Sequence, residues 1–314
     1  LLLVLICRSA VADSRSTSQW YRDARAWPLA ASGLLLCASG LGFLGVWAVL
    51  GGPWEGPITW RKPILFGISG GLTAISIGWA FAKLPTRRWD VPLAWSATVA
   101  LLVEVGLIDL QKLRGVASHF NRTTPLDSIV YDLMGGLILW VTAVSFDLML
   151  RYFFRPPRDP AACSPDMLLA IRGGLVALVW SCLLGIWVSV NGEIRLEQGL
   201  EPDRFGAAGV PKFAHGAVIH ALQWLPFLAW TMRRVGVGEQ ARLPGIAAAT
   251  LGTLLVAAYA LLQTLEGLGR FDATLPSAAL LALGVLLLAV PAGLSAASAA
   301  LRRRPVAAAG GNGR

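Results

Sequence analysis

Eight apolar runs of about twenty residues each make up most of the chain, and polar segments separate them. An α-helix needs about twenty apolar residues to cross a hydrocarbon core of about 30 Å. The runs cover residues 30–50, 63–84, 91–110, 127–152, 168–190, 213–232, 246–265 and 277–297. This pattern predicts an all-α protein, a polytopic transmembrane helix bundle with about eight spans.

The composition favours a membrane protein over a soluble one. Hydrophobic residues are 55% of the chain and charged residues only 14%, whereas a soluble domain carries about 25% charged residues. Eight separate apolar runs are also too many to hide in a water-soluble core. The lipid bilayer is therefore the first partner that the sequence predicts.

The basic residues are unevenly divided between the two sides of the predicted bundle. The segment before the first run and those after the second, fourth, sixth and eighth runs hold 17 of the 27 basic residues, and the opposite segments hold nine. The positive-inside rule then predicts that both termini are cytoplasmic. The net charge of +9 is thus explained by the orientation of the helices in the membrane. No nucleic-acid partner is expected, because the chain has no soluble basic domain.

The chain divides into three predicted parts. Residues 1–26 form a cytoplasmic N-terminal segment, residues 27–300 an eight-helix transmembrane domain, and residues 301–314 a disordered cytoplasmic tail. An outer loop, residues 191–211, should be irregular, with one short surface helix near residues 194–199. Residues 1–12 lack an initiator methionine, which indicates a truncated or misassigned start or else a signal-peptide remnant.

Ionisable side chains gather on the predicted outer side, at or near the outer ends of the runs. Such groups are expensive inside a membrane and usually functional. Carboxylates beside imidazoles in a low dielectric can act as acid and base near neutral pH. The candidate catalytic residues are Glu104, His119, Asp132, His220 and Glu266.

Further polar residues on the same side are candidates for contacting a substrate. Tyr259, Gln263, Glu266 and Arg270 recur at i, i+4, i+7 and i+11, so they share one face of a helix. Interhelical hydrogen bonds that only hold the bundle together explain glutamine and tyrosine equally well. The predicted substrate-binding residues are Arg61, Lys62, Arg114, Asn121, Gln223, Tyr259, Gln263 and Arg270.

The histidines His119, His215 and His220 are the candidate metal ligands. His215 and His220 are five residues apart, so on a regular helix their rings point about 140° apart and one ion cannot readily bind both. A divalent metal would need His119 with one of them and a nearby carboxylate, and a haem held by two histidines is the other cofactor considered. Structural histidines or proton carriers fit the sequence as well.

Two local patterns predict structure more directly. Thr124, Pro125 and Asp127 fit the N-cap, N1 and N3 positions of a helix start, which follows a polar loop that is either a lid or a static cap. Glycines recur in the first two runs, and small residues let helix backbones approach closely in lipid. These two helices should therefore pack tightly.

Three stretches resemble a family of bacterial multi-pass membrane proteins. They are WRKPILF at 60–66, QKLRGVASHFNRTTPLD at 111–127 and FAHGAVIHALQWLP at 213–226. The shared patterns are W-x-K-P, R-G-x-x-S-H-F-N-x-x-T-P-x-D and H-A-L-Q-x-L-P. The resemblance implies a bacterial cytoplasmic-membrane protein with a shared fold and a shared outer-face site, and it implies no reaction.

Four functions fit these observations. The first is a membrane-embedded enzyme or binding protein whose outward-facing pocket in the outer leaflet takes a lipid-like or amphipathic small molecule. The second is a proton-coupled small-solute transporter. It ranks lower because transport needs polar groups along the whole crossing or broken helices, and the inner halves offer only weak candidates such as Ser69, Thr73 and Ser76. A haem- or metal-binding electron-transfer protein and a non-catalytic assembly partner are the third and fourth.

Overall fold

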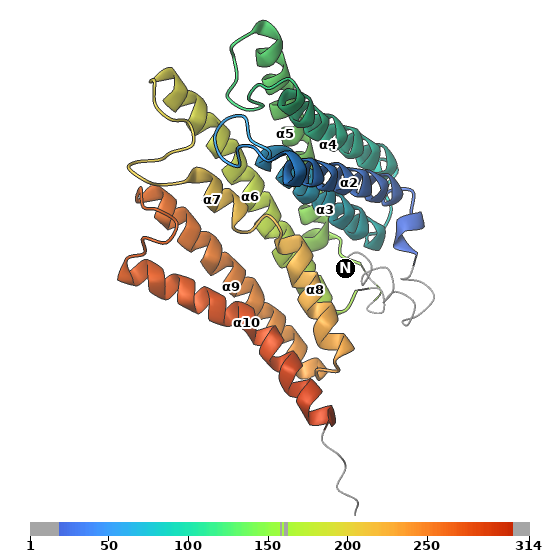
Figure 1. Ribbon diagram of the computed structural model, residues 1–314. Helices are drawn as coiled ribbons and strands as arrows, with labels where there is room; N and C mark the ends of the chain where they lie inside the picture. Colours follow the sequence, from blue (N-terminus) through green and yellow to red (C-terminus); the bar gives the residue numbers. More distant parts are fainter. Residues whose placement is uncertain (1–18, 158, 160–162, 304–314) are drawn as a thin grey trace, which may run out of the picture.

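Helices are the regular structure throughout residues 19–157, 159 and 163–303, the part of the chain that the computed structural model describes. Within these residues β pairing is limited to one isolated bridge, between Phe205 and Gly209. The all-α prediction is therefore confirmed. After a 3-10 turn, η1 (Trp20–Arg22), the helices are α2 (Trp27–Leu50), α3 (Arg61–Lys83), α4 (Asp90–Leu113), α5 (Pro125–Phe154), α6 (Pro165–Glu197), α7 (Pro211–Gly216), α8 (Ala221–Arg234), α9 (Glu239–Leu265) and α10 (Leu275–Arg303) (Figure 1).

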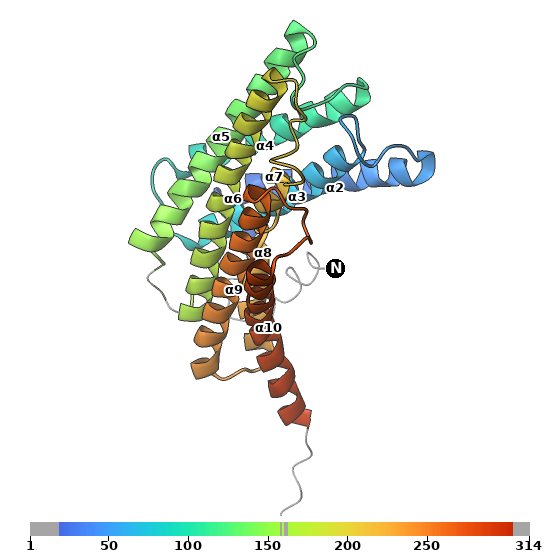
Figure 2. The same ribbon diagram turned by 90° about the vertical axis from the view of Figure 1, so that its left-hand side faces the viewer.

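The loops between these helices gather at two opposite ends of the molecule (Figures 1 and 2). We call the end with residues 51–60, 114–124, 198–210 and 266–274 the distal end, and the end with residues 84–89 and 235–238 the proximal end. Helices α2, α3 and α4 form one group, α9 and α10 form a pair, and α5, α6 and α8 lie between them. The alternating loops of the sequence thus correspond to two ends of one bundle.

Seven of the described helices are long and apolar enough to cross a membrane: α2, α3, α4, α5, α6, α9 and α10. This supports a multi-pass helical membrane protein. The side on which each terminus lies stays a prediction. The predicted continuous helix over residues 213–232 is wrong, because α7 ends at Gly216 and α8 begins only at Ala221.

The other predicted runs correspond to helices, several of which extend past the apolar stretch. Helix α6 continues to Glu197, so the first part of the predicted outer loop is helical, in the region where a short surface helix was expected. Helix α10 continues to Arg303, past the predicted start of the disordered tail. Residues 1–18 and 304–314 lie outside the described residues, and with them most of the predicted N-terminal segment and tail.

Helices α2 and α3 pack closely because their glycines face each other. A Cβ added to Gly33 would lie 2.5 Å from the carbonyl oxygen of Gly71, and one added to Gly67 would lie 2.8 Å from the Cα of Gly40. No side chain larger than hydrogen fits at these positions unless the helices move apart. The predicted close packing is confirmed. It sets the position of α3, whose other faces contact α4, α5 and α8.

Candidate functional site

The break between α7 and α8 leaves a turn, residues 217–220, inside the bundle. On one side of the turn His215 contacts Ser181 of α6, and on the other His220 contacts Ser69 of α3. Both serines belong to apolar helices of membrane-spanning length, so the turn lies at membrane depth. Non-helical backbone at this depth is tolerated only where protein groups or a water-filled cavity satisfy its hydrogen bonds.

Ser181 and His215 supply part of that compensation. The Ser181 hydroxyl donates to the carbonyl oxygen of His215 at 2.7 Å, and His215 Nδ1 donates to the carbonyl oxygen of Ser181 at 2.7 Å. The ring lies over Gly185, where an added Cβ would be 3.1 Å from Nδ1. This reciprocal pair holds the end of α7 against α6. Together with Gly216, a weak helix former, it gives a physical reason for the helix to stop.

His220 and Gln223 face α3 on the other side of the turn. His220 Nε2 lies 3.1 Å from Ser69 Oγ, and Gln223 Nε2 donates to Ser76 Oγ at 3.0 Å. His220 Nδ1 and Gln223 Oε1 are buried, and neither makes a hydrogen bond of normal geometry within the described structure, although the two side chains interact with each other. Leaving a buried polar atom unsatisfied costs about 1–3 kcal/mol. Two such atoms beside one turn make it the candidate site of the described chain.

Glycines also bring α6 against the start of α8. A Cβ added to Gly174 would lie 2.6 Å from the Cα of Leu222, and one added to the preceding Gly173 would lie 2.6 Å from a methyl carbon of Thr250 in α9. The segment around the turn packs against α3, α6 and α9, while Gly216 beside it is exposed. The predicted substrate-binding residue Gln223 and the predicted catalytic residue His220 lie at this turn and are partly buried.

The distal loop, residues 114–124, forms a cap that is tied to Asp127. Asp127 Oδ1 accepts hydrogen bonds from Gln111 Nε2 at 3.1 Å and from Arg114 Nη1 at 2.8 Å. The Asp127 backbone N–H donates to Thr124 Oγ1 at 3.1 Å, which confirms the predicted N-cap. Asn121 donates to a backbone carbonyl of the same loop. The predicted binding residues Arg114 and Asn121 thus have structural partners.

His119 lies within this cap rather than on its surface. Its ring packs against Phe66 and Tyr131, with centroid distances of 5.4 and 6.2 Å. Burial, followed by the positive charges of Lys62 and Lys212, lowers the pKa of His119 to about 3. The imidazole is therefore neutral at physiological pH.

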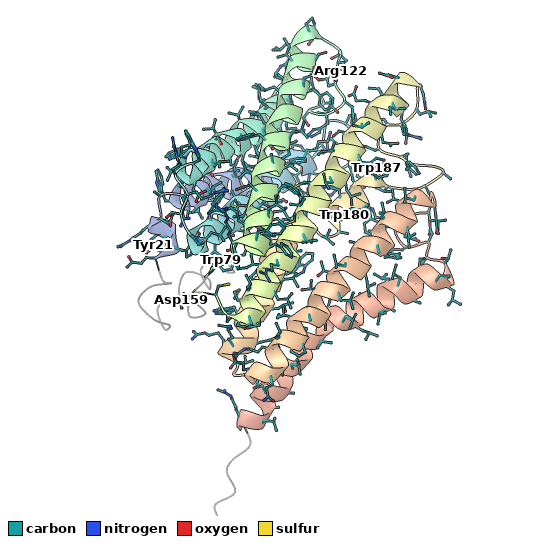
Figure 3. The ribbon with its side chains drawn as sticks, turned by 180° about the vertical axis from the view of Figure 1, so that it is seen from behind. Tyr21, Trp79, Arg122, Asp159, Trp180 and Trp187 are labelled. Atoms are coloured by element: carbon teal, nitrogen blue, oxygen red, sulfur yellow. The ribbon has the colours of Figure 1, made fainter. Side chains whose placement is uncertain are left out.

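The residues that follow His119 fix the cap to α5 and α6. Phe120 has a φ of 56°, and a Cβ added to Gly192 would overlap its ring. Arg122 forms ion pairs with Asp132 at 2.9 Å and with Glu193 at 3.1 Å, at the distal end (Figure 3). The Asp132 side chain is 62% exposed, which separates it from the buried candidates.

The predicted polar stripe of α9 closes the turn between α9 and α10. The Tyr259 hydroxyl donates to the carbonyl oxygen of Arg270 at 2.7 Å, and Gln263 Nε2 donates to that of Gly269 at 3.0 Å. Tyr259 and Gln263 are buried, whereas Glu266 is exposed at the C-cap. These contacts favour a structural role for the stripe.

Arg61 and Lys62 open α3 at the distal end, as the sequence predicted. Lys62 Nζ donates to the carbonyl oxygen of Pro57 at 3.4 Å. Lys62, Lys112 and Ser118 contribute to the lining of a small cavity of about 10 Å³. No ion pair to Arg61 is present among the described residues. Within the described residues, no hydrogen bond or ion pair joins either basic residue to the turn at residues 217–220.

Glu104 is buried in α4, against a different face of α3. Its residue exposure is 5%, and within the described chain it has no hydrogen bond or ion pair. A Cβ added to Gly70 would lie 3.6 Å from Val105 of α4, and Gly70 points about 100° away from Ser69 on α3. Glu104 and His220 therefore lie beside different faces of α3, and no hydrogen bond joins the two side chains.

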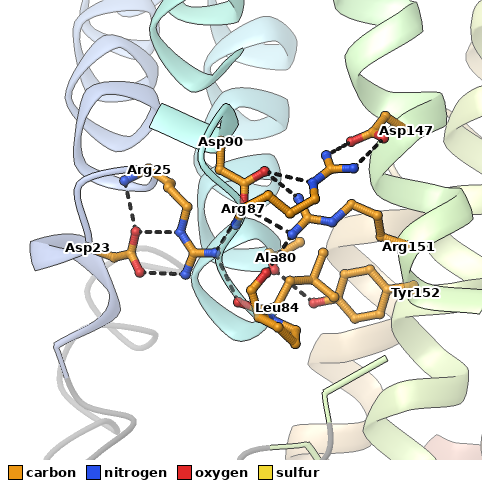
Figure 4. Close-up of polar contacts among 10 residues, drawn as sticks. Asp23, Arg25, Ala80, Leu84, Arg87, Asp90, Asp147, Arg151 and Tyr152 are labelled. Carbon is orange, nitrogen blue, oxygen red and sulfur yellow. Dashed lines mark hydrogen bonds and ion pairs between the residues drawn. The ribbon is translucent and has the colours of Figure 1, made fainter. Parts of the chain in front are cut away.

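Sequence reasoning missed a charged cluster at the proximal end (Figure 4). Asp90 is fully buried and accepts hydrogen bonds from Arg151 at 2.9 and 3.0 Å and from Arg87 at 3.2 Å, and Arg25 lies 3.5 Å away. Arg87 also pairs with Asp147 of α5. The available signal was Asp90 at a helix start, where an acid is favourable, beside two arginines in the preceding loop.

Asp166 in the first turn of α6 repeats this arrangement. Arg233 contacts it at 2.6 Å and Arg242 at 3.6 Å. The carboxyl is buried, so the two arginines connect the start of α6 to the end of α8 and the start of α9. Both clusters are internally paired, which indicates a structural role.

Each of the three histidines has a serine neighbour: Ser118 for His119, Ser181 for His215 and Ser69 for His220. His119 lies in the distal cap and the other two lie at the turn. In the part of the chain that the structure covers, no group of three or more His, Cys, Asp or Glu side chains is placed to hold a metal ion. The candidate metal ligands therefore do not converge there.

The fold defines a multi-pass helical membrane protein, and the site defines one with a discontinuous helix. Comparison of the chain with family models, with curated proteins and with solved structures finds no significant match. The functional argument therefore depends on the geometry of the chain itself.

Proposed function

We propose that the protein transports a small, uncharged polar solute, which binds at the turn of residues 217–220. The observation that carries this proposal is the pair of buried atoms, His220 Nδ1 and Gln223 Oε1, which make no hydrogen bond of normal geometry and interact only with each other. Secondary transporters bind their substrates near the bilayer midplane, where helices are interrupted, because polar groups are free to bind there. The interruption between α7 and α8 has this character.

The side chains at the turn suit an uncharged solute. Ser69, Ser76, His220 and Gln223 offer hydroxyl, imidazole and amide groups. No carboxylate, guanidinium or ammonium group forms a hydrogen bond with them in the described residues. A bound ion would therefore be buried without a counter-charge, at high cost. A polyol or an amide, which carries both donors and acceptors, could satisfy both free atoms.

The interrupted helix changes the ranking that the sequence favoured. Transport needs broken helices or polar groups along the whole crossing. It ranked second because the sequence alone offered only weak candidates for either. The outward-facing pocket has less support, because Asp132 and Glu266 are exposed and Tyr259 and Gln263 hold a turn. Coupling of solute movement to protons stays part of the proposal.

We also propose that the distal end faces outward and that both termini are cytoplasmic, in the cytoplasmic membrane of a bacterium. The support is the arginine content at the proximal end, with Arg87 and Arg88 in the loop 84–89, Arg155 directly after α5 and Arg233 in the last turn of α8. Basic residues are retained on the cytoplasmic side during insertion.

Cysteine accessibility tests whether water and solutes reach the turn. In a background without the four native cysteines, we expect Gln223→Cys in reconstituted vesicles to react with a charged, membrane-impermeant thiol reagent. The matched control is Ala249→Cys, a fully buried position of α9, which should stay unreactive. A Gln223→Cys variant that is folded yet unreactive from both sides of the membrane would exclude a solute path.

Solute flux tests the substrate class. Vesicles with the wild-type protein should take up glycerol or urea at least tenfold faster than protein-free vesicles. His220→Leu and Gln223→Leu should lose this increase, because each removes one of the free atoms, and Asp132→Asn should retain it. Equal uptake of both solutes with and without protein would contradict an uncharged polyol or amide substrate.

A second candidate function is binding of a lipid acyl chain near the distal end. An apolar groove of about 480 Å³ lies between α9 and α10, and Tyr259, Phe271, Leu281 and Val285 contribute to its lining. We expect native mass spectrometry to find a retained phospholipid that Ala282→Trp displaces. An unchanged lipid complement in that variant would argue against this groove.

A further inference from the structure

We propose that Glu104 is a proton-binding site within the membrane: its carboxyl group holds a proton where α4 packs against α5. The site is separate from the proposed solute site, because α4 and the turn of residues 217–220 pack on different faces of α3. The inference therefore does not depend on solute transport.

The position of Glu104 follows from the helix geometry. Gln111 lies two turns further along the same face of α4, and its side chain donates to Asp127 of α5. Glu104 therefore faces α5 as well. Leu101 and Ile108, one turn to either side, are almost completely buried. The Glu104 side chain is thus buried between apolar side chains near the middle of a helix of membrane-spanning length.

Among the residues that the structure describes, no cation forms an ion pair with this carboxyl group. On its own helix the nearest titratable group is Asp109, which accepts a hydrogen bond from Ser39 of α2 at 2.9 Å. The charged groups that α5 presents to this side of α4 have other partners: Asp127 is bound by Arg114 and Asp132 by Arg122. The part of α3 that packs on this side of α4, around Gly70, carries no charged side chain.

The proton is the ligand that this environment fits. An ionised carboxylate without a partner costs several kcal/mol when it leaves water, whereas the neutral acid costs only as much as a polar group. A metal cation needs several oxygen ligands, and no described oxygen-bearing side chain hydrogen-bonds to Glu104. The acid form of Glu104 is therefore the form that the packing of α4 against α5 stabilises.

Infrared spectroscopy of the reconstituted protein tests the proposal directly. We expect the wild-type protein at neutral pH to show the carbonyl band of a protonated carboxyl group, shifted in heavy water. Glu104→Gln should lose this band, and Asp109→Asn should keep it. Absence of the band from the wild-type protein, or its loss in Asp109→Asn alone, would overturn the assignment.

A chemical probe gives an independent reading on the wild-type chain. The protonated carboxyl group adds across one C=N bond of dicyclohexylcarbodiimide. Its oxygen bonds to the central carbon and its proton moves to nitrogen, and the adduct rearranges to a stable N-acylurea without a leaving group. We expect the adduct on the peptide that contains Glu104, at least tenfold faster than with a water-soluble carbodiimide.

The pH dependence of labelling distinguishes a proton site from mere accessibility. Once the acid form is the minority, the rate should fall by about tenfold per pH unit, because only the protonated carboxyl group reacts. No adduct at Glu104, or equal rates with the two reagents, would overturn the proposal. Since neither measurement uses a solute, failure here is distinguishable from failure of the transport proposal.

Discussion

His220 Nε2 lies 3.1 Å from Ser69 Oγ, although the two residues are 151 positions apart in the chain. Ser69 lies on the face of α3 opposite to the glycines that contact α2. Tight packing on one face of α3 therefore fixes the serine that meets the interrupted helix on the other. This relationship connects the glycines of the first two runs with the candidate site.

The glycine contact between α2 and α3 gives a prediction about stability. Gly33→Ala should reduce the free energy of unfolding by about 1–3 kcal/mol, because the added Cβ meets the Gly71 carbonyl oxygen and the helices must separate. Thermal unfolding in detergent measures this loss. Gly42→Ala is the matched control, since its Cβ would meet no atom within 4 Å. Equal melting temperatures for both variants would show that the contact does not limit packing.

The proximal charge cluster should depend on its central carboxylate. Asp90→Asn leaves the buried Arg151 and Arg25 without their shared anion, and breaking a buried ion pair costs about 3–5 kcal/mol. A large fall in melting temperature should follow. Glu239→Gln, at the start of α9 and 83% exposed, should change stability by less than about 0.5 kcal/mol. Similar effects of the two substitutions would argue against the cluster as an anchor.

His119 should make the protein less stable in acid. Its pKa is about 3 in the folded protein against 6.5 for the free side chain, so between these values the unfolded chain binds the proton and the folded chain does not. Stability is fully present above pH 6.5 and falls as the pH decreases, by up to about 1.4 kcal/mol per unit. His119→Asn should flatten this part of the profile, as followed by melting temperature from pH 7 to pH 4. An unchanged slope would mean that the ring is solvated.

Two aspartates of α5 should respond differently to the same substitution. Asp132→Asn should change stability by less than about 0.5 kcal/mol, because its pair with Arg122 is exposed. Asp127→Asn should lower the melting temperature much more, since this carboxylate accepts hydrogen bonds from Gln111, Arg114 and Thr124. Hydrogen exchange of residues 114–124 should increase only in Asp127→Asn. The reverse order would show that the cap depends on the surface pair.

Part of the candidate site could be predicted from the sequence, and part could not. His220 and Gln223 were recognised because ionisable and amide side chains are rare in apolar runs. The break beside them was not, because residues 213–232 read as one apolar helix and the contacts that end it come from Ser181 and Ser69. The stripe from Tyr259 to Arg270 was recognised as one helix face, but its partners are backbone carbonyls of the next turn.

The sequence by itself determined the helical class, the approximate positions of seven long helices, the N-cap at Thr124 and the close packing of the first two helices. The helical class follows because an apolar run of this length in lipid must satisfy its backbone hydrogen bonds within itself. The N-cap and the glycine contact can be predicted because their residues are close in sequence or repeat along one helix face. Only the tertiary structure decided where a helix stops inside the bundle and which buried polar atoms find partners. Those outcomes depend on hydrogen bonds between segments far apart in the chain, whose geometry no local pattern specifies.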